Sequence, residues 1–96
     1  FSGDTINNFI AADDSIRLGV AGTAGNYDEQ TGLIYADAYA AANVLISNGQ
    51  KDIVVVYVNN ADSYVFADGN GSNAITTVIK LAGVNLTQVS DTDFVI

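Results

Sequence analysis

The run at residues 53–58, Ile-Val-Val-Val-Tyr-Val, constrains the fold of this chain more than any other segment. Its residues are β-branched or aromatic, which favours a strand, and no polar side chain alternates with them. This pattern predicts a strand that is buried on both faces. A turn at residues 59–62 follows, and residues 63–67, Ser-Tyr-Val-Phe-Ala, predict the hairpin partner that returns beside it.

Residues 33–47 are the one segment that predicts a helix. The segment is rich in Ala, the residue with the highest helix propensity, and helical spacing places Ile34, Ala38, Ala41 and Leu45 on one face. The pair Asn48-Gly49 ends it, because both residues tolerate the left-handed backbone conformation. The many small side chains indicate close packing of the helix against a sheet.

The remaining segments predict further strands. Residues 1–30 indicate short strands separated by polar turns. Residues 74–81 alternate, so that one face of a strand would carry Ile75, Thr77, Ile79 and Leu81. We therefore expect an α+β fold, a mainly antiparallel β-sheet with one Ala-rich helix packed on it. We expect residues 1–96 to form a single domain that was cut from a longer, soluble chain.

The charge balance narrows the choice of partners. Eleven Asp and Glu residues stand against three Lys and Arg, which gives a net charge of −8, and ten of the eleven acids are Asp. Such a surface repels phosphate backbones, so we expect no nucleic-acid partner. No apolar run is long enough to span a membrane. Short carboxylates suit divalent cations such as calcium, although the charge could also serve solubility alone.

The residue types that are missing exclude most catalytic machinery. The chain contains neither His nor Cys, so it can form no Ser-His-Asp or Cys-His system and no ordinary zinc site. Paired carboxylates remain at Asp13-Asp14 and at Asp91 with Asp93. Carboxylate catalysis also needs a shaped pocket, for which a small chain with one sheet and one helix has little room. We therefore expect that this chain is not an enzyme.

Two groups of oxygen-bearing residues are candidates for a calcium site. The turn 68–73, Asp-Gly-Asn-Gly-Ser-Asn, offers Asp68, Asn70 and Asn73 as ligands on a Gly-rich backbone. It is not an EF-hand loop, because the twelfth position is Ile79 in place of a bidentate Glu. The alternative is an ordinary hairpin turn that is rich in turn formers.

The second group is Asp4, Asp13 and Asp14, which flank short predicted strands. Calcium binding would require their oxygens to converge. The alternative is that these residues cap turns and solvate sheet edges.

Three stretches in order resemble the carboxyl-terminal region of RTX-type proteins that bacteria export by type I secretion. Residues 4–18 are similar to the D-x-I-x-x-F and D-x-I-x-L segment that follows the family's calcium-binding β-roll. Residues 62–84 are similar to its D-x-Y-V-F-x-D-x-N-G hairpin. The ending Asp93, Phe94, Val95 and Ile96 is similar to the family's terminal signal, an acidic residue followed by three hydrophobic ones.

The resemblance implies a secreted or cell-surface domain that carries the export signal at 93–96. Its partners would be the type I secretion machinery and an upstream RTX β-roll of the same chain, whose calcium-dependent folding this domain would cap and nucleate. The nonapeptide repeat of the roll itself is absent here. Ser72 and Asn73 stand where the family has Asp-Gly, which removes one carboxylate from the hairpin loop.

Three functions are consistent with these features. The first is the export and capping domain. The second is a self-associating structural module of a surface layer or an extracellular filament, which the β-rich, nearly Lys-free chain favours. The third is the tail of a hydrolase whose catalytic part lies upstream.

Overall fold

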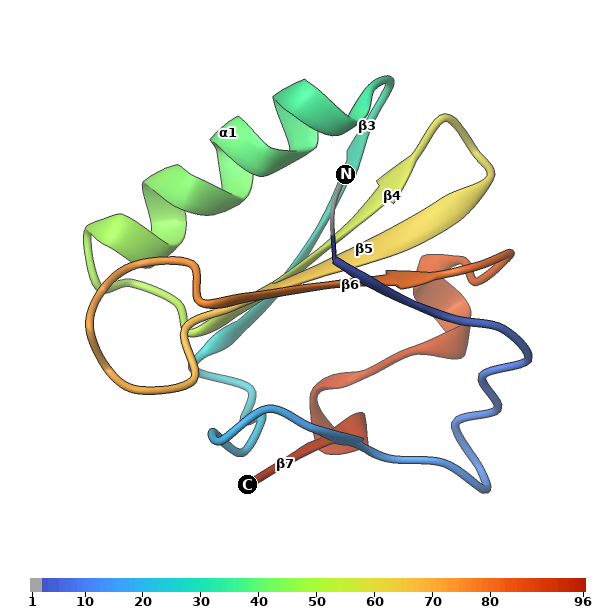
Figure 1. Cartoon of the computed structure of the whole chain (residues 1–96), viewed down its shortest axis with the longest axis horizontal. Helices are drawn as coiled ribbons and strands as arrows, with labels where there is room; N and C mark the ends of the chain where they lie inside the picture. Colours follow the sequence, from blue (N-terminus) through green and yellow to red (C-terminus); the bar gives the residue numbers. More distant parts are fainter. Residues whose placement is uncertain (1–2) are drawn as a thin grey trace.

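The computed structural model describes residues 3–96, which form three layers (Figure 1). Helix α1 (Tyr35–Ser47) covers one face of a five-stranded sheet. The opposite face is covered by a layer that contains two short paired strands, β2 (Ile16–Arg17) and β7 (Phe94–Val95), together with the segments that adjoin them. No helix within residues 3–96 has the length and apolar character needed to cross a membrane.

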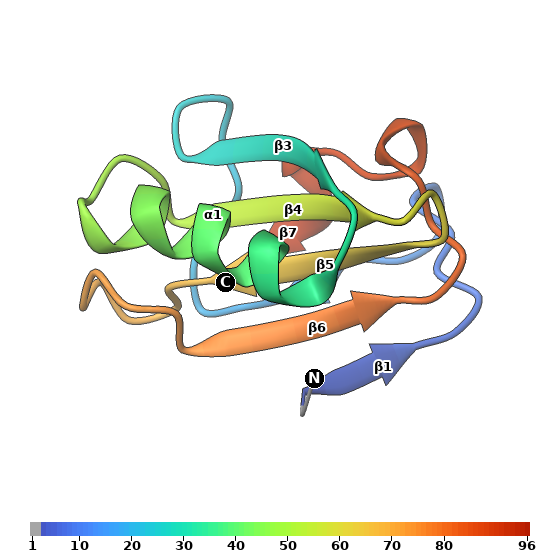
Figure 2. The ribbon, with the colours of Figure 1, turned by 90° about the horizontal axis from the view of Figure 1, so that it is seen from above.

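The five-stranded sheet has the order β1-β6-β5-β4-β3 (Figure 2). Its strands are β1 (Asp4–Ile6), β3 (Tyr27–Gly32), β4 (Ile53–Val58), β5 (Asp62–Ala67) and β6 (Thr77–Leu81). The central β4, β5 and β6 pair antiparallel, as expected from the two turn signals. The two outer pairs, β1 with β6 and β3 with β4, are parallel. The predicted α+β fold with one helix on a sheet is therefore confirmed, and the prediction that the sheet is antiparallel is mostly but not entirely right.

Strand β4 is buried on both faces, as its apolar run predicts. Val54 and Val56 pack under α1 in a cluster with Ala38, Ala42 and Phe66 among others. Ile53 and Val55 point the other way, into a second cluster that contains Phe9, Ile16, Leu18 and Phe94. The central sheet therefore separates two apolar cores.

Helix α1 forms where predicted, but its buried face differs from the predicted one. Ala38, Ala42 and Ile46 are buried, whereas Ile34 lies at the N-cap position and is 55% exposed. Ala41 and Leu45 are half-buried at the flank of the packed face. Ala residues lie on both the buried and the exposed side of the helix, so its residue pattern contains little contrast from which the buried face could be predicted.

Two further predictions about strands were wrong in detail. Residues 27–32 form a six-residue strand, although we expected only short strands before residue 30. Strand β6 begins at Thr77, and Ile75 packs in the helix-side core, away from Ile79 and Leu81. Ile75 therefore does not share a face with these two residues, because it precedes the regular alternation of the strand.

The layer opposite the helix is built from both ends of the chain. Strand β2 pairs in parallel with β7, so that Ile16 lies beside Phe94 and Arg17 beside Val95. Two 3₁₀ helices, η1 (Leu86–Gln88) and η2 (Asp91–Asp93), lead the chain into β7. The hydroxyl of Ser63 in β5 donates to the carbonyl oxygen of Val84 at 2.6 Å and ties this layer to the sheet.

Candidate functional site

The carboxyl-terminal segment, residues 93–96, is built into the fold. Phe94 is 1% exposed and packs in the core on the side of the sheet opposite α1. Asp93 is also buried, and its Oδ2 accepts the backbone N–H of Ser90 at 2.8 Å, which closes the short helix η2. Of the four residues, Ile96 alone is strongly exposed, at 75%.

Backbone hydrogen bonds hold this segment from the amino-terminal side. Leu18 N–H donates to the carbonyl oxygen of Val95 at 2.9 Å, and Gly22 N–H donates to that of Phe94 at 3.0 Å. Gly22 also lies so close to the carbonyl of Asp91 that a Cβ at this position would overlap it. Glycine at position 22 is therefore needed for the close approach of the two segments.

Tyr27, which sequence reasoning did not single out, forms part of the seat of Phe94. Their rings lie 5.8 Å apart, and the Tyr27 hydroxyl donates to Glu29 Oε2 at 2.7 Å. Burial, the hydrogen bond to Glu29 and the negative charges of Glu29, Asp93 and Asp91 raise the pKa of Tyr27 above its ordinary value. No local pattern indicated this role, because the contact joins residues 67 positions apart in the sequence.

The turn at 68–73 is organised around the carboxylate of Asp68, which is 2% exposed. Its Oδ2 accepts the N–H of Asn73 at 2.7 Å, and its Oδ1 accepts those of Ser72 at 3.1 Å and Asn70 at 3.3 Å. Burial disfavours the charged form of Asp68, but the N–H groups of Asn73, Ser72, Asn70 and Gly71 outweigh burial and lower its pKa. Asp68 thus serves the loop as an internal anchor.

The other predicted ligands of this loop contribute in different ways. The side-chain Oδ1 of Asn70 accepts the N–H of Ser72 at 3.1 Å. Asn73 adopts a left-handed backbone conformation with φ 57°, and its side chain lies near Gly49 beyond the end of α1. The loop therefore brings Asp68, Asn70 and Asn73 into one turn, but backbone donors already use the carboxylate oxygens of Asp68.

The second predicted group of ligands does not converge into a ligand set. Asp4 lies in the edge strand β1, whereas Asp13 and Asp14 lie in an exposed turn in which Asp14 Oδ2 accepts the N–H of Ile10 at 2.8 Å. Within residues 3–96, no three acidic side chains are grouped so that they could hold a metal ion. Calcium binding by this domain stays a prediction.

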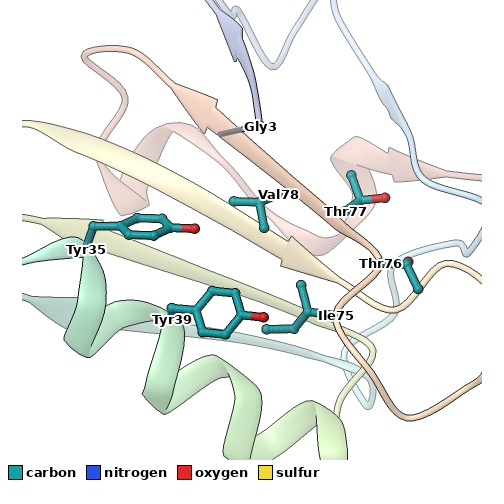
Figure 3. Close-up of a pocket in the computed structure, with 7 residues that line it drawn as sticks. All are labelled: Gly3, Tyr35, Tyr39, Ile75, Thr76, Thr77 and Val78. Atoms are coloured by element: carbon teal, nitrogen blue, oxygen red, sulfur yellow. The ribbon is translucent and has the colours of Figure 1, made fainter. Parts of the chain in front are cut away.

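An open pocket of about 330 Å³ lies between α1 and β6 (Figure 3). Tyr35 and Tyr39 reach into it from successive turns of the helix, and Val78 faces them from the sheet. Gly3, Ile75, Thr76 and Thr77 complete the lining. These seven residues offer hydroxyls and apolar surface, but they include no carboxylate or amine side chain for acid–base chemistry.

No protein-family model, curated protein or solved structure matches this chain.

Proposed function

We propose that this chain is a non-catalytic, secreted domain of an RTX-like protein, whose last four residues act first as an export signal and then as a structural closure. The observation that carries the proposal is the position of Phe94, which resembles a signal residue in sequence and is 1% exposed in the fold. A receptor could read Asp93 and Phe94 only before the domain folds, because folding removes both side chains from solvent.

The segments that contact the tail support this order of events. Residues 94 and 95 pair with residues 16 and 17, which precede them by 78 positions in the chain. The tail can therefore be sequestered only when residues from both ends have come together. A chain held unfolded in the cytoplasm would present the signal, and the same chain folded outside the cell would bury it.

In this proposal calcium acts on the upstream β-roll that the resemblance implies. Ordering of the roll outside the cell would favour folding of the attached domain, because a ligand that binds only a folded state stabilises that state. The hydrogen bonds at Asp68 favour a loop that forms without a bound cation.

Export of a passenger protein fused ahead of residues 1–96 tests the proposal. The fusion is expressed in a bacterium that has a type I secretion apparatus, and the passenger is measured in the medium and in the cells. Deletion of Asp93–Ile96 is expected to leave the passenger inside the cells.

The matched control is the double substitution Ala11→Ser and Ala12→Ser, at exposed positions outside the tail. This variant should be exported like the unaltered fusion. Equal export of the deletion variant and the control would contradict the signal role.

A second candidate function is self-association in an extracellular layer or filament. The observation that favours it is the position of the exposed apolar residues. Of the six large apolar side chains that are exposed in the described part of the chain, Leu33, Ile34, Tyr39 and Val44 lie on α1 or directly before it. Sedimentation of the chain over a range of concentrations tests this function, and a monomer throughout would contradict it.

A further inference from the structure

We propose that the outer edge of β3 is a docking site for an extended segment of a partner protein, which adds to the sheet as a further strand and carries two consecutive Lys or Arg residues. Strand β3 lies at one end of the five-stranded sheet (Figure 2). Within residues 3–96, no strand pairs with its outer side. The proposal concerns the folded domain and is independent of the export role of residues 93–96.

The backbone groups that face this edge belong to alternate residues. The carbonyl oxygens of Asn26 and Gly32 accept N–H groups from the side of β4, at 3.0 and 2.9 Å. In a parallel pair the N–H and C=O of one residue point to the same side, and this side alternates along the strand. The even-numbered residues of β3 therefore face β4, whereas Tyr27, Glu29 and Thr31 direct their N–H and C=O groups outward, where an added strand can pair with them.

Most features that protect an exposed edge strand are absent from β3. Natural sheets commonly shorten their edge strands, or place Lys, Pro or a bulge in them. At the other end of this sheet β1 has three residues, whereas β3 has six and keeps an unbroken register with β4 from Tyr27 to Gly32. The chain contains no Pro, and β3 contains no Lys. The outer edge of β3 is therefore long and regular enough to receive another strand.

The side chains of β3 indicate the charge of its partner. Asp28 and Glu29 are consecutive, so they project from opposite faces of the sheet. Glu29 lies on the face of Tyr27 and accepts its hydroxyl at 2.7 Å, whereas Asp28 accepts Gln30 Nε2 at 3.0 Å on the face of α1. Two consecutive cationic residues in an added strand would also project from opposite faces, so that each meets one carboxylate.

The same charges disfavour a second copy of this chain as the partner. Two molecules with a charge of −8 repel each other, and pairing of two β3 edges would bring like charges together at Asp28 and Glu29. A basic segment gains where a second copy loses. Because the ion pairs are exposed to solvent, the affinity for a basic segment should fall as the salt concentration rises.

Titration of the isotope-labelled 96-residue chain with a synthetic peptide, followed by NMR, tests the site. The peptide has about eight residues, with two Lys at its centre and Val and Thr on either side. We expect the amides of Tyr27, Glu29 and Thr31 to exchange more slowly with solvent when the peptide is bound. The amides of Asp28 and Gln30 pair with β4 and should be protected with or without the peptide.

Three outcomes of this titration would overturn the proposal. The first is no binding at peptide concentrations up to about 1 mM. The second is binding that leaves the exchange of the three outward amides unchanged, because attraction by charge alone would then explain it. The third is equal binding of a peptide in which two Glu replace the two Lys.

Charge variants of the chain test the selectivity. The double variant Asp28→Asn and Glu29→Gln should bind the Lys peptide at least about threefold more weakly, because both ion pairs are lost. The control, Asp4→Asn with Asp13→Asn, removes the same charge at two exposed positions away from β3. It should bind the peptide like the unaltered chain, and equal dissociation constants for the two double variants would overturn the proposal.

A backbone variant tests the hydrogen bonds of the edge. Thr31→Pro removes an outward N–H that β4 does not use, so the sheet should keep its fold while peptide binding weakens. Thr31→Val retains the N–H and is the control, and thermal unfolding checks the fold of both variants. A peptide with N-methyl groups on alternate residues makes the same test on the unaltered chain. Equal affinity of methylated and unmethylated peptides, in both possible alternations, would overturn the proposal.

Discussion

Asp68 illustrates how a single buried carboxylate can organise a loop through backbone hydrogen bonds. Three backbone N–H groups donate to its two oxygens within 3.3 Å. Composition identified this residue as a candidate ligand, because Asp and Asn in a Gly-rich turn fit a cation site and a self-capped turn equally well. The positions of the backbone donors fit a self-capped turn, and calcium binding by the loop stays a prediction.

Substitution of Asp68 by Asn should lower the free energy of unfolding by about 1–3 kcal/mol, because one charged acceptor is replaced by a donor next to backbone N–H groups. The folded-state pKa of Asp68 is depressed, so its contribution is present above about pH 4 and is lost as the pH falls through the folded-state pKa. Urea unfolding at a series of pH values measures both effects. The exposed Asp13→Asn is the control, and an equal loss in both variants would contradict the anchor role.

At the scale of elements, local patterns predicted the centre of the fold. The apolar run of β4, the turn before β5 and the Ala-rich helix each depend on residues close in sequence, and each forms as expected. The parallel pairs β1–β6 and β2–β7 could not be predicted in this way. Each joins segments more than 70 residues apart, and no residue pattern within one segment specifies its distant partner.

The candidate site also combines a feature that one local segment predicted with features that depend on distant contacts. The ending at 93–96 was identified from its resemblance to an export signal, which is a pattern within one segment. Its insertion between the amino-terminal segment and the sheet, and the contribution of Tyr27 to its seat, depend on contacts across the whole chain. The signal role of these four residues stays a prediction, and no pattern in the sequence predicted that folding buries Asp93 and Phe94.

The close approach of Gly22 to Asp91 leads to a prediction about the layer formed by β2 and β7. Gly22→Ala should lower the free energy of unfolding by about 1–3 kcal/mol or more. The added Cβ would overlap the carbonyl oxygen of Asp91, and relief of this overlap would require η2 to move. Gly25→Ala, in the turn that follows, is the matched control, because the nearest atom to the added Cβ would be Thr23 Oγ1 at 3.9 Å. Thermal unfolding compares the two, and similar midpoints would contradict the close packing of the tail.

At the scale of the whole molecule, the charge of −8 is confined to a body of about 30 × 28 × 23 Å. The Debye length at physiological ionic strength is about 8 Å, so salt screens most of the repulsion between acids across the molecule. Sodium chloride should therefore raise the midpoint of thermal unfolding.

A comparison of calcium with magnesium distinguishes specific ion binding from general screening of the negative charges. We expect calcium to stabilise the isolated domain no more than magnesium at equal concentration and ionic strength, because the oxygens of Asp68 already accept backbone N–H groups. Thermal unfolding during parallel titrations measures the difference. A saturable effect of calcium alone, lost in Asp68→Asn, would show that the loop binds the ion.

The central claim is that residues 93–96 act as a signal in the unfolded chain and as a closure in the folded one. The measurement that tests it most directly is export of a fused passenger for two variants, together with their unfolding free energies. Ile96→Asp alters the exposed end of the tail, whereas Phe66→Ala removes a fully buried ring in the other core and should cost about 3–5 kcal/mol.

The account predicts that Ile96→Asp reduces export while stability stays close to that of the unaltered chain. It also predicts that Phe66→Ala loses stability while export continues, because the chain passes through the apparatus unfolded. Normal export of Ile96→Asp together with loss of export in Phe66→Ala would contradict the account, because export would then depend on the fold and not on the terminal sequence.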